Sequence, residues 1–154
     1  MEIKRISSLE SELVIELFDN YRIFYKQPSD IELAKNFIQA RLDNNESVIF
    51  VAILSDENQI IPIGFTQLYP KFSSGKAIKI WILNDLYVQP QYRKQSVGEK
   101  LIKTALKYAK EDGASHVELS TAVDNLNAQN LYESIGFTKQ KPDTDFFNYK
   151  IDLR

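Results

Sequence analysis

The sequence of 154 residues contains no cysteine and a single histidine, His116. The absence of cysteine excludes disulfides, thiolate metal ligands and cysteine nucleophiles together. One histidine without any cysteine does not make a metal site, so we expect none. The lack of cysteine also fits a reducing compartment.

The sequence also lacks a strong net charge and any long apolar run. Lysine and arginine number 19 against 21 acidic residues, which gives a formal net charge of −2. Because no basic field results, we expect no nucleic-acid partner. No apolar run approaches the roughly 18 residues that span a membrane, and residues 1–5 lack the apolar core of a signal peptide. We therefore expect a cytoplasmic protein with no membrane partner.

The composition that remains is typical of a globular protein, with 44% hydrophobic and 26% charged residues. The length is sufficient for one hydrophobic core. No repeat, linker or low-complexity segment divides the chain. We expect a single domain over residues 1–154.

The first part of the chain predicts one short strand and two helices. Residues 2–6 fit a strand. Apolar side chains then recur every four residues from Leu9 to Tyr21, which indicates one face of a helix. A second helix is predicted over 31–42, ending near Asp43.

Three strands follow in close succession, over residues 47–54, 60–69 and 77–88. The first two are apolar runs separated by a short polar turn, which is typical of an antiparallel hairpin. A second short polar segment precedes the third strand. The three strands therefore predict an antiparallel meander.

The last part of the chain alternates between helices and strands. We predict a helix over 97–110, a strand over 117–120, a helix over 125–134 and a closing strand over 146–151. A strand–helix–strand unit with a right-handed crossover pairs its two strands in parallel. The fold class is therefore mixed α/β.

A short basic loop, residues 93–98, connects the third long strand to the helix over 97–110. The first turn of a helix carries unpaired backbone N–H groups and the positive end of the helix dipole, which together bind phosphate groups. The alternative is an ordinary connection in which Arg93 and Lys94 are solvated. These residues alone leave both interpretations open.

A second polar pattern follows the strand over 117–120. Asn125, Ala128 and Tyr132 have the spacing of one helix face. Ligands of open α/β sheets bind beyond the carboxyl ends of the strands, so this face and the basic loop are expected at one site. The alternative is a buried tyrosine beside a capping asparagine.

The two segments together resemble the GNAT superfamily of acetyl-coenzyme A-dependent N-acetyltransferases. The loop over 93–98 matches the family pattern Arg/Gln-x-x-Gly-x-Gly/Ala, except that Ser96 occupies the first glycine position. The later pattern Asn-x-x-Ala-x-x-x-Tyr, followed by a Gly-Phe pair, matches the segment 125–137. The resemblance extends over residues 2–151. It implies a mostly antiparallel sheet of six to seven strands, with a parallel pair at a splayed centre and helices on both faces.

The resemblance implies transfer of an acetyl group from acetyl-CoA to a primary amine by direct attack. It is closest to the diamine and polyamine type, so a small polyamine-like acceptor is expected. One alternative is a protein or peptide N-acetyltransferase. The other is a coenzyme A-binding regulatory protein without turnover.

The resemblance also implies the residues of the site. Tyr132 is the expected general acid and Asp85 a candidate catalytic carboxylate, while Tyr21, Tyr25 and Asn84 are expected at the acceptor. The residues expected to hold acetyl-CoA are Leu86, Tyr87, Val88, Arg93, Lys94, Gln95, Ser96, Val97, Gly98, Glu99, Asn125, Asn127 and Ala128.

Two further expectations concern Ser96 and the C-terminal segment. If the loop requires a positive φ at Ser96, serine costs about 1–2 kcal/mol there relative to glycine, which would weaken coenzyme binding. The apolar and aromatic residues 146–149 could pair two copies of the chain edge to edge, which predicts a homodimer.

Overall fold

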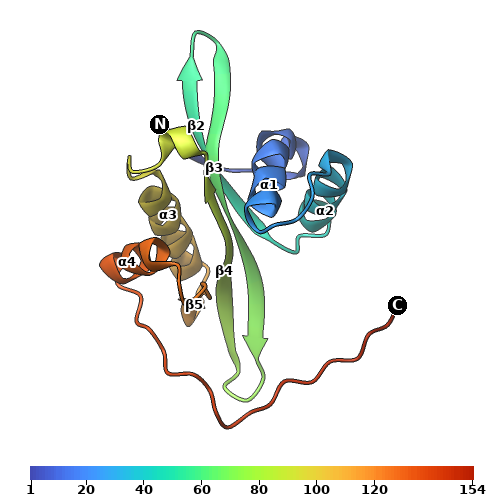
Figure 1. Ribbon diagram of the computed structural model, residues 1–154, viewed down its shortest axis with the longest axis vertical. Coiled ribbons are helices and arrows are strands. Elements are labelled where there is room, and N and C mark those ends of the chain that lie inside the picture. The colour runs from blue at the N-terminus through green and yellow to red at the C-terminus, as the bar shows by residue number, and fades with distance from the viewer. The chain divides into compact units, whose positions relative to one another are not determined.

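The computed structural model describes residues 1–154 (Figure 1). The chain forms two compact units, residues 1–120 and 121–154.

The first unit is built on one five-stranded sheet with the strand order β1-β2-β3-β4-β5. Neighbours from β1 to β4 pair antiparallel, whereas β4 and β5 pair in parallel. The parallel pair follows from the crossover helix that connects β4 to β5. The strands are β1 (Glu2–Arg5), β2 (Val48–Asp56), β3 (Gln59–Ser73), β4 (Ile78–Val88) and β5 (His116–Glu118).

Helices cover both faces of this sheet (Figure 1). They are α1 (Glu12–Phe24), α2 (Ile31–Asp43) and α3 (Val97–Glu111), with short 3₁₀ segments η1 (Ser8–Glu10) and η2 (Pro90–Tyr92). The hydrophobic core that packs against α1 and α2 includes Ile49, Val51 and Ile53 of β2. The alternate residue Phe50 contacts Tyr108 of α3 with 5.9 Å between ring centroids. Successive β2 side chains thus fill the two opposite layers.

The α1–α2 connection is fixed by one buried carboxylate. Asp19, on α1, is 3% exposed and accepts hydrogen bonds from Ser29 Oγ at 2.6 Å and from the backbone N–H of Asp30 at 2.9 Å. Arg22 Nη1 adds an ion pair at 3.3 Å. Asp30 in turn caps α2 by accepting from the N–H of Leu33. The start of α2 is therefore held against the body of α1.

A bulge interrupts β4 just before its end. Gln67 of β3 pairs with Asp85, and the next β3 residue, Leu68, pairs with Leu83. Asn84 is thus the extra residue on β4, and such a residue bends its strand and increases the local twist. β5 pairs only with residues 80–82 of β4. Beyond residue 82, the β4 edge that faces away from β3 has no strand partner.

The second unit contains one helix, α4 (Leu126–Ile135). Asn125 Oδ1 accepts a hydrogen bond from the N–H of Ala128 at 3.2 Å and caps the helix N-terminus. Gly136, with φ of 124°, ends the helix. Residues 137–154 form no helix or strand.

The mixed α/β class is confirmed, as are the meander and the parallel pair. The number of strands is five instead of the expected six to seven, and the predicted closing strand over 146–151 is not formed. A strand needs a second backbone to satisfy its N–H and C=O groups, and a two-residue apolar period does not specify that partner. No helix of the chain is both long enough and apolar enough to cross a membrane.

Candidate active site

The loop between β4 and α3 has the backbone of an anion-binding turn. Lys94 and Ser96 both adopt left-handed conformations, with φ of 61° and 65°. No side chain caps the start of α3, so its first N–H groups are not taken by a side-chain acceptor. The condition stated for Ser96 in the sequence analysis, a positive φ, is met. Such a helix end can bind an anion through its dipole and its N–H groups.

Arg93 holds this loop to the end of β4. Its Nε donates to the carbonyl oxygen of Val88 at 2.8 Å. Its guanidinium carbon lies 5.5 Å from the ring centroid of Tyr87 and 5.9 Å from that of Phe24. The side chain is therefore engaged with the strand and two aromatic rings, whereas Lys94, the other cation of the loop, is exposed.

The other loop residues expected at the coenzyme serve the local structure as follows. Gln95 Nε2 donates to the carbonyl of Gln91 at 3.2 Å. Glu99 forms an ion pair along α3 with Lys103 at 2.8 Å. Val97 is buried and Gly98 is half-buried. The side chains of Gln95, Val97 and Glu99 thus take part in local contacts.

The end of β4 lies close to Gly64 of β3. A Cβ atom at Gly64 would lie 2.9 Å from the Tyr87 carbonyl oxygen and 3.3 Å from Val88 Cγ2. Only a residue without a side chain allows this approach. Leu86, Tyr87 and Val88 are half-buried, and their strand edge is the one without a partner. Backbone N–H groups at such an edge can polarise a thioester carbonyl.

Asp85 lies under the bulge and is 2% exposed. Gln67 Nε2 donates to its Oδ2 at 2.6 Å, and Asn84 Nδ2 donates to its Oδ1 at 2.7 Å. Burial raises the pKa of Asp85 above its usual value, and these two hydrogen bonds oppose that rise only in part. Asp85 therefore holds a proton more readily than an exposed aspartate does.

Two tyrosines of α1 stand beside this carboxyl. Tyr21 donates from its hydroxyl to the Asn84 carbonyl at 3.4 Å and stacks edge-on against Phe65. Burial, followed by the nearby charge of Asp85, raises the pKa of Tyr21. The Tyr25 ring centroid lies 4.8 Å from that of Tyr21, and Tyr25 is 55% exposed. The structure thus brings Tyr21 and Asn84 to Asp85, and Tyr25 packs against Tyr21.

The remaining expected residues belong to the second unit. Asn125 uses its side chain as the α4 cap, and Ala128 donates the N–H that it accepts. Asn127 is exposed. Tyr132 is half-buried and contacts Phe137 edge-to-face at 5.9 Å. These residues share one helix or its cap, as the spacing predicted.

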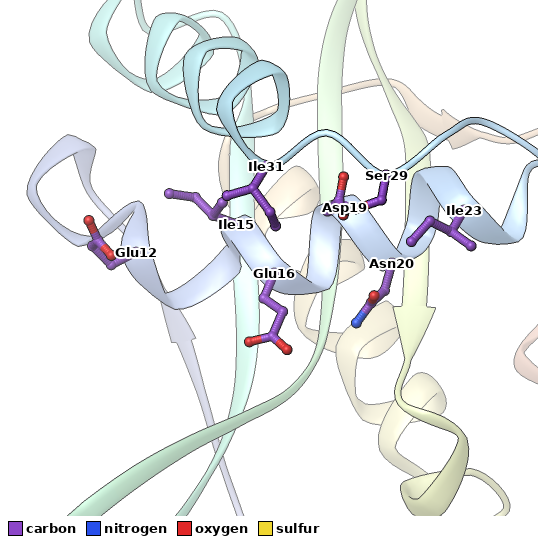
Figure 2. Close-up of a pocket in the computed structure, with 8 residues that line it drawn as sticks. All are labelled: Glu12, Ile15, Glu16, Asp19, Asn20, Ile23, Ser29 and Ile31. Atoms are coloured by element: carbon purple, nitrogen blue, oxygen red, sulfur yellow. Dashed lines mark hydrogen bonds between the residues drawn. The ribbon is translucent and has the colours of Figure 1, made fainter.

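A separate cavity of about 460 Å³ runs along α1 and the start of α2 (Figure 2). None of its lining residues comes from β4 or the basic loop. Figure 2 shows Asp19 and Ser29 side by side. The hydrogen bond from Ser29 to Asp19 fixes the α1–α2 connection. The lining consists of Glu12, Ile15, Glu16, Asp19, Asn20, Ile23, Ser29 and Ile31.

Two residues next to Asp85 were not predicted from the sequence. Gln67 and Thr66 are both fully buried on β3, and Thr66 Oγ1 donates to the Asp85 carbonyl at 2.8 Å. The available signal was a pair of polar residues inside an otherwise apolar strand. Such residues need buried partners.

Strand β4 of this mixed α/β sheet thus leads into a helix N-terminus without a side-chain cap, an arrangement that binds phosphate groups in α/β proteins. The model of the acetyltransferase (GNAT) family matches residues 12–137. The chain belongs to this family, whose members are N-acetyltransferases that use acetyl-CoA.

Relatives and solved structures resemble this chain over nearly its full length. The uncharacterized N-acetyltransferase YhfO of Bacillus subtilis is 41% identical over 99% of this chain and 98% of its own. A crystal structure of a probable acetyltransferase, 40% identical, covers 100% of this chain and 99% of its own with a TM-score of 0.84. The thialysine N-epsilon-acetyltransferase of Caenorhabditis elegans is 22% identical over 98% of this chain and 91% of its own.

One solved neighbour contains the cosubstrate. An acetyltransferase from Clostridium acetobutylicum, solved with acetyl-CoA, covers 97% of this chain and 95% of its own with a TM-score of 0.73. It is 15% identical, so the likeness concerns the fold alone.

Proposed function

We propose that the chain acetylates the primary amine of a small, cationic, polyamine-like molecule by direct attack on acetyl-CoA. The observation that carries this proposal is the Asp85 cluster beside the unpartnered end of β4. A carboxyl group next to the rings of Tyr21 and Tyr25 favours a cation over a neutral or anionic acceptor. The name of the nematode relative, which states acetylation at an Nε amine, supports the same class of acceptor.

Acetyl-CoA supplies an activated acetyl group when bound. The proposed role of the loop over 93–98 and of the α3 N-terminus is to hold its pyrophosphate by backbone N–H groups. Asn125, Asn127 and Ala128 would contribute from the α4 start. The family model spans both units, which supports one catalytic domain formed by the whole chain.

The reaction needs a stabilised negative charge on the thioester oxygen. We assign this to the backbone N–H groups of Leu86 and Val88, on the β4 edge that has no strand partner. Preorganised donors of this kind contribute about 3–4 kcal/mol to such a transition state. Their side chains are replaceable in this role, whereas the strand geometry is not.

The reaction also needs a proton on the departing sulfur. Tyr132 is the proposed donor, because a phenol with a pKa near 10 is protonated at neutral pH. Asp85 is the proposed acceptor of the proton that the cationic amine must lose before it attacks. The homodimer and the cytoplasmic location expected from the sequence stay predictions.

A mass-spectrometric screen of amines with acetyl-CoA tests the proposal. The panel contains diamines, polyamines, lysine-like amino acids, aminoglycosides and peptide N-termini, and thiol release is followed in parallel. We expect one acetyl group on a primary amine of a diamine, a polyamine or a lysine-like acceptor. Acetylation of peptides alone would instead identify a peptide N-acetyltransferase. Coenzyme A binding without thiol release would contradict catalysis.

A further inference from the structure

Asp85 is closed off from solvent by its own hydrogen-bond partners. It is 2% exposed, and each carboxylate oxygen already accepts one side-chain N–H, from Gln67 and from Asn84. The backbone carbonyl of Asp85 accepts a hydrogen bond from Thr66 Oγ1. An acceptor amine therefore does not reach this carboxyl directly, and a proton must pass through a neighbouring group.

Tyr21 is the neighbour that reaches both the carboxyl and the surface. Its hydroxyl donates to the Asn84 carbonyl at 3.4 Å and, by rotating its O–H bond, can donate instead to the Asp85 carboxyl, whose pKa it lowers in part. Its ring packs against the exposed Tyr25. A hydroxyl both accepts and donates, so it can take a proton on one side and give one on the other.

We propose that Tyr21 is a catalytic residue that relays the acceptor's proton to Asp85, and that Gln67 is the positioning residue that orients the Asp85 carboxyl for this transfer. The inference rests on the proposed function and names two roles that it leaves open.

The proton transfers balance as follows. The acceptor ammonium gives one proton to the Tyr21 oxygen while the Tyr21 hydroxyl proton passes to the Asp85 carboxylate, which leaves a neutral amine. The amine nitrogen forms its bond to the acetyl carbon as the carbon–sulfur bond breaks. The second nitrogen proton passes to solvent, while Tyr132 gives its proton to the sulfur and regains one from solvent. Asp85 then returns its proton through Tyr21 to solvent, so each acetylation releases one proton.

Gln67 is suited to both protonation states of Asp85. Its Nε2 donates to the carboxylate, and its Oε1 is buried without a hydrogen-bond partner. A buried oxygen without a hydrogen-bond donor costs free energy. The unpaired Oε1 of Gln67 therefore lowers the stability of the folded protein. Rotation of the amide would present that oxygen to the protonated acid. The same side chain can therefore donate to the carboxylate or accept from the acid.

The ionisable groups that face this cluster come from three elements. Tyr21 and Tyr25 lie on α1, and Tyr69 lies on β3. Burial, then the charge of Asp85, raises the pKa of Tyr69, and Arg41 of α2 opposes this. Both buried tyrosines stay protonated through the pH range in which Asp85 titrates. The pH dependence of the amine step is therefore assigned to Asp85.

Kinetics of Tyr21→Phe test the relay, with Tyr108→Phe as the matched control because Tyr108 is also half-buried between two aromatic rings. We expect kcat to fall about a hundredfold in Tyr21→Phe, with an unchanged Kd for coenzyme A, and no change in Tyr108→Phe. Full kcat in Tyr21→Phe overturns the relay. A wild-type protein that acetylates no amine contradicts the proposed function instead.

A carboxyl titration by ¹³C NMR tests Gln67, with the Asp85 signal assigned from Asp85→Asn. Gln67→Met removes the donor to the carboxylate, so the Asp85 titration and the rising limb of kcat/KM should both move to higher pH. Gln39→Met is the control, because Gln39 also donates to an aspartate, Asp43, at 2.8 Å. A lower melting temperature with an unmoved Asp85 titration would reduce Gln67 to a structural role and overturn its assignment.

Discussion

Gly64 and the carbonyl oxygen of Tyr87 approach so closely that a Cβ atom at Gly64 would lie 2.9 Å from that oxygen. The peptide of Tyr87 lies between the two N–H groups assigned to the thioester oxygen. A glycine on β3 therefore fixes the geometry of the reacting end of β4 from the neighbouring strand.

Gly64→Ala should disturb both the fold and the catalytic edge. The added methyl group meets backbone, which cannot rotate away, and overpacking of this kind costs about 1–3 kcal/mol. We expect a lower melting temperature and a lower kcat. Gly75→Ala is the control, because a Cβ at Gly75 meets nothing within 4 Å. Equal melting temperatures for the two variants, measured by calorimetry, would contradict the close approach.

Ser96→Gly should stabilise the loop before α3. Serine at φ of 65° is strained, by about 1–2 kcal/mol in the left-handed region, and glycine is not. We expect the melting temperature to rise by about 2–4 °C per kcal/mol recovered. Coenzyme A binding, followed by calorimetry, should be as tight as in the wild type or tighter.

Thr104→Gly provides a control of opposite sign. Thr104 lies in the interior of α3, where glycine costs about 0.5–1 kcal/mol. A Ser96→Gly variant that is destabilised like Thr104→Gly would show that the serine side chain, and not its backbone conformation, matters in this loop.

The sequence predicted the elements well where periodicity was long. Helix α3 and the three long strands lie within a few residues of their predicted bounds. The bulge at Asn84 was not predicted, because one inserted residue leaves the apolar pattern of β4 almost unchanged. Gln67 was missed for a related reason, since its importance depends on the residue opposite it across β3 and β4. Register is a property of two strands and is absent from either alone.

The basic loop shows a second limit of sequence reasoning. Its position was predicted and a positive φ at Ser96 was considered only as a condition, but the direction of the Arg93 side chain was not predicted. Arg93 turns back to the Val88 carbonyl and two aromatic rings that lie on β4 and α1. The contacts of a long cationic side chain depend on residues from other helices and strands. A local sequence motif does not contain those residues.

The Asp19 carboxylate should make the stability of the first unit dependent on acid pH. Burial raises its pKa, but the hydrogen bonds from Ser29 and Asp30 and the charge of Arg22 outweigh this, so the pKa lies below the ordinary 3.8. A lowered pKa in the folded state contributes stability that is present above 3.8 and is lost as the pH falls through the folded value. Asp19→Asn should therefore unfold more readily at neutral pH, by about 1–3 kcal/mol.

The measured quantity is the difference in the free energy of unfolding between the wild type and Asp19→Asn. Urea denaturation at a series of pH values should show this difference shrinking below pH 3.8. Asp56→Asn is the control, because Asp56 is an exposed residue at the end of β2. A difference that stays constant down to the lowest pH would mean that the charge of Asp19 contributes nothing to the α1–α2 connection.

Tyr132→Phe separates proton donation from packing in the proposed reaction. The ring contact to Phe137 at 5.9 Å is retained in phenylalanine, so α4 should keep its structure and coenzyme A its affinity. The substitution removes the hydroxyl group, and a positioned general acid contributes about 10²–10⁴ in rate. We expect kcat to fall within that range at an unchanged Kd for coenzyme A. Tyr149→Phe, which removes a hydroxyl from a residue that is 92% exposed, should leave both unchanged. If Tyr132→Phe keeps the wild-type kcat, the proton of the departing sulfur comes from another group or from water, and Tyr132 serves only to pack.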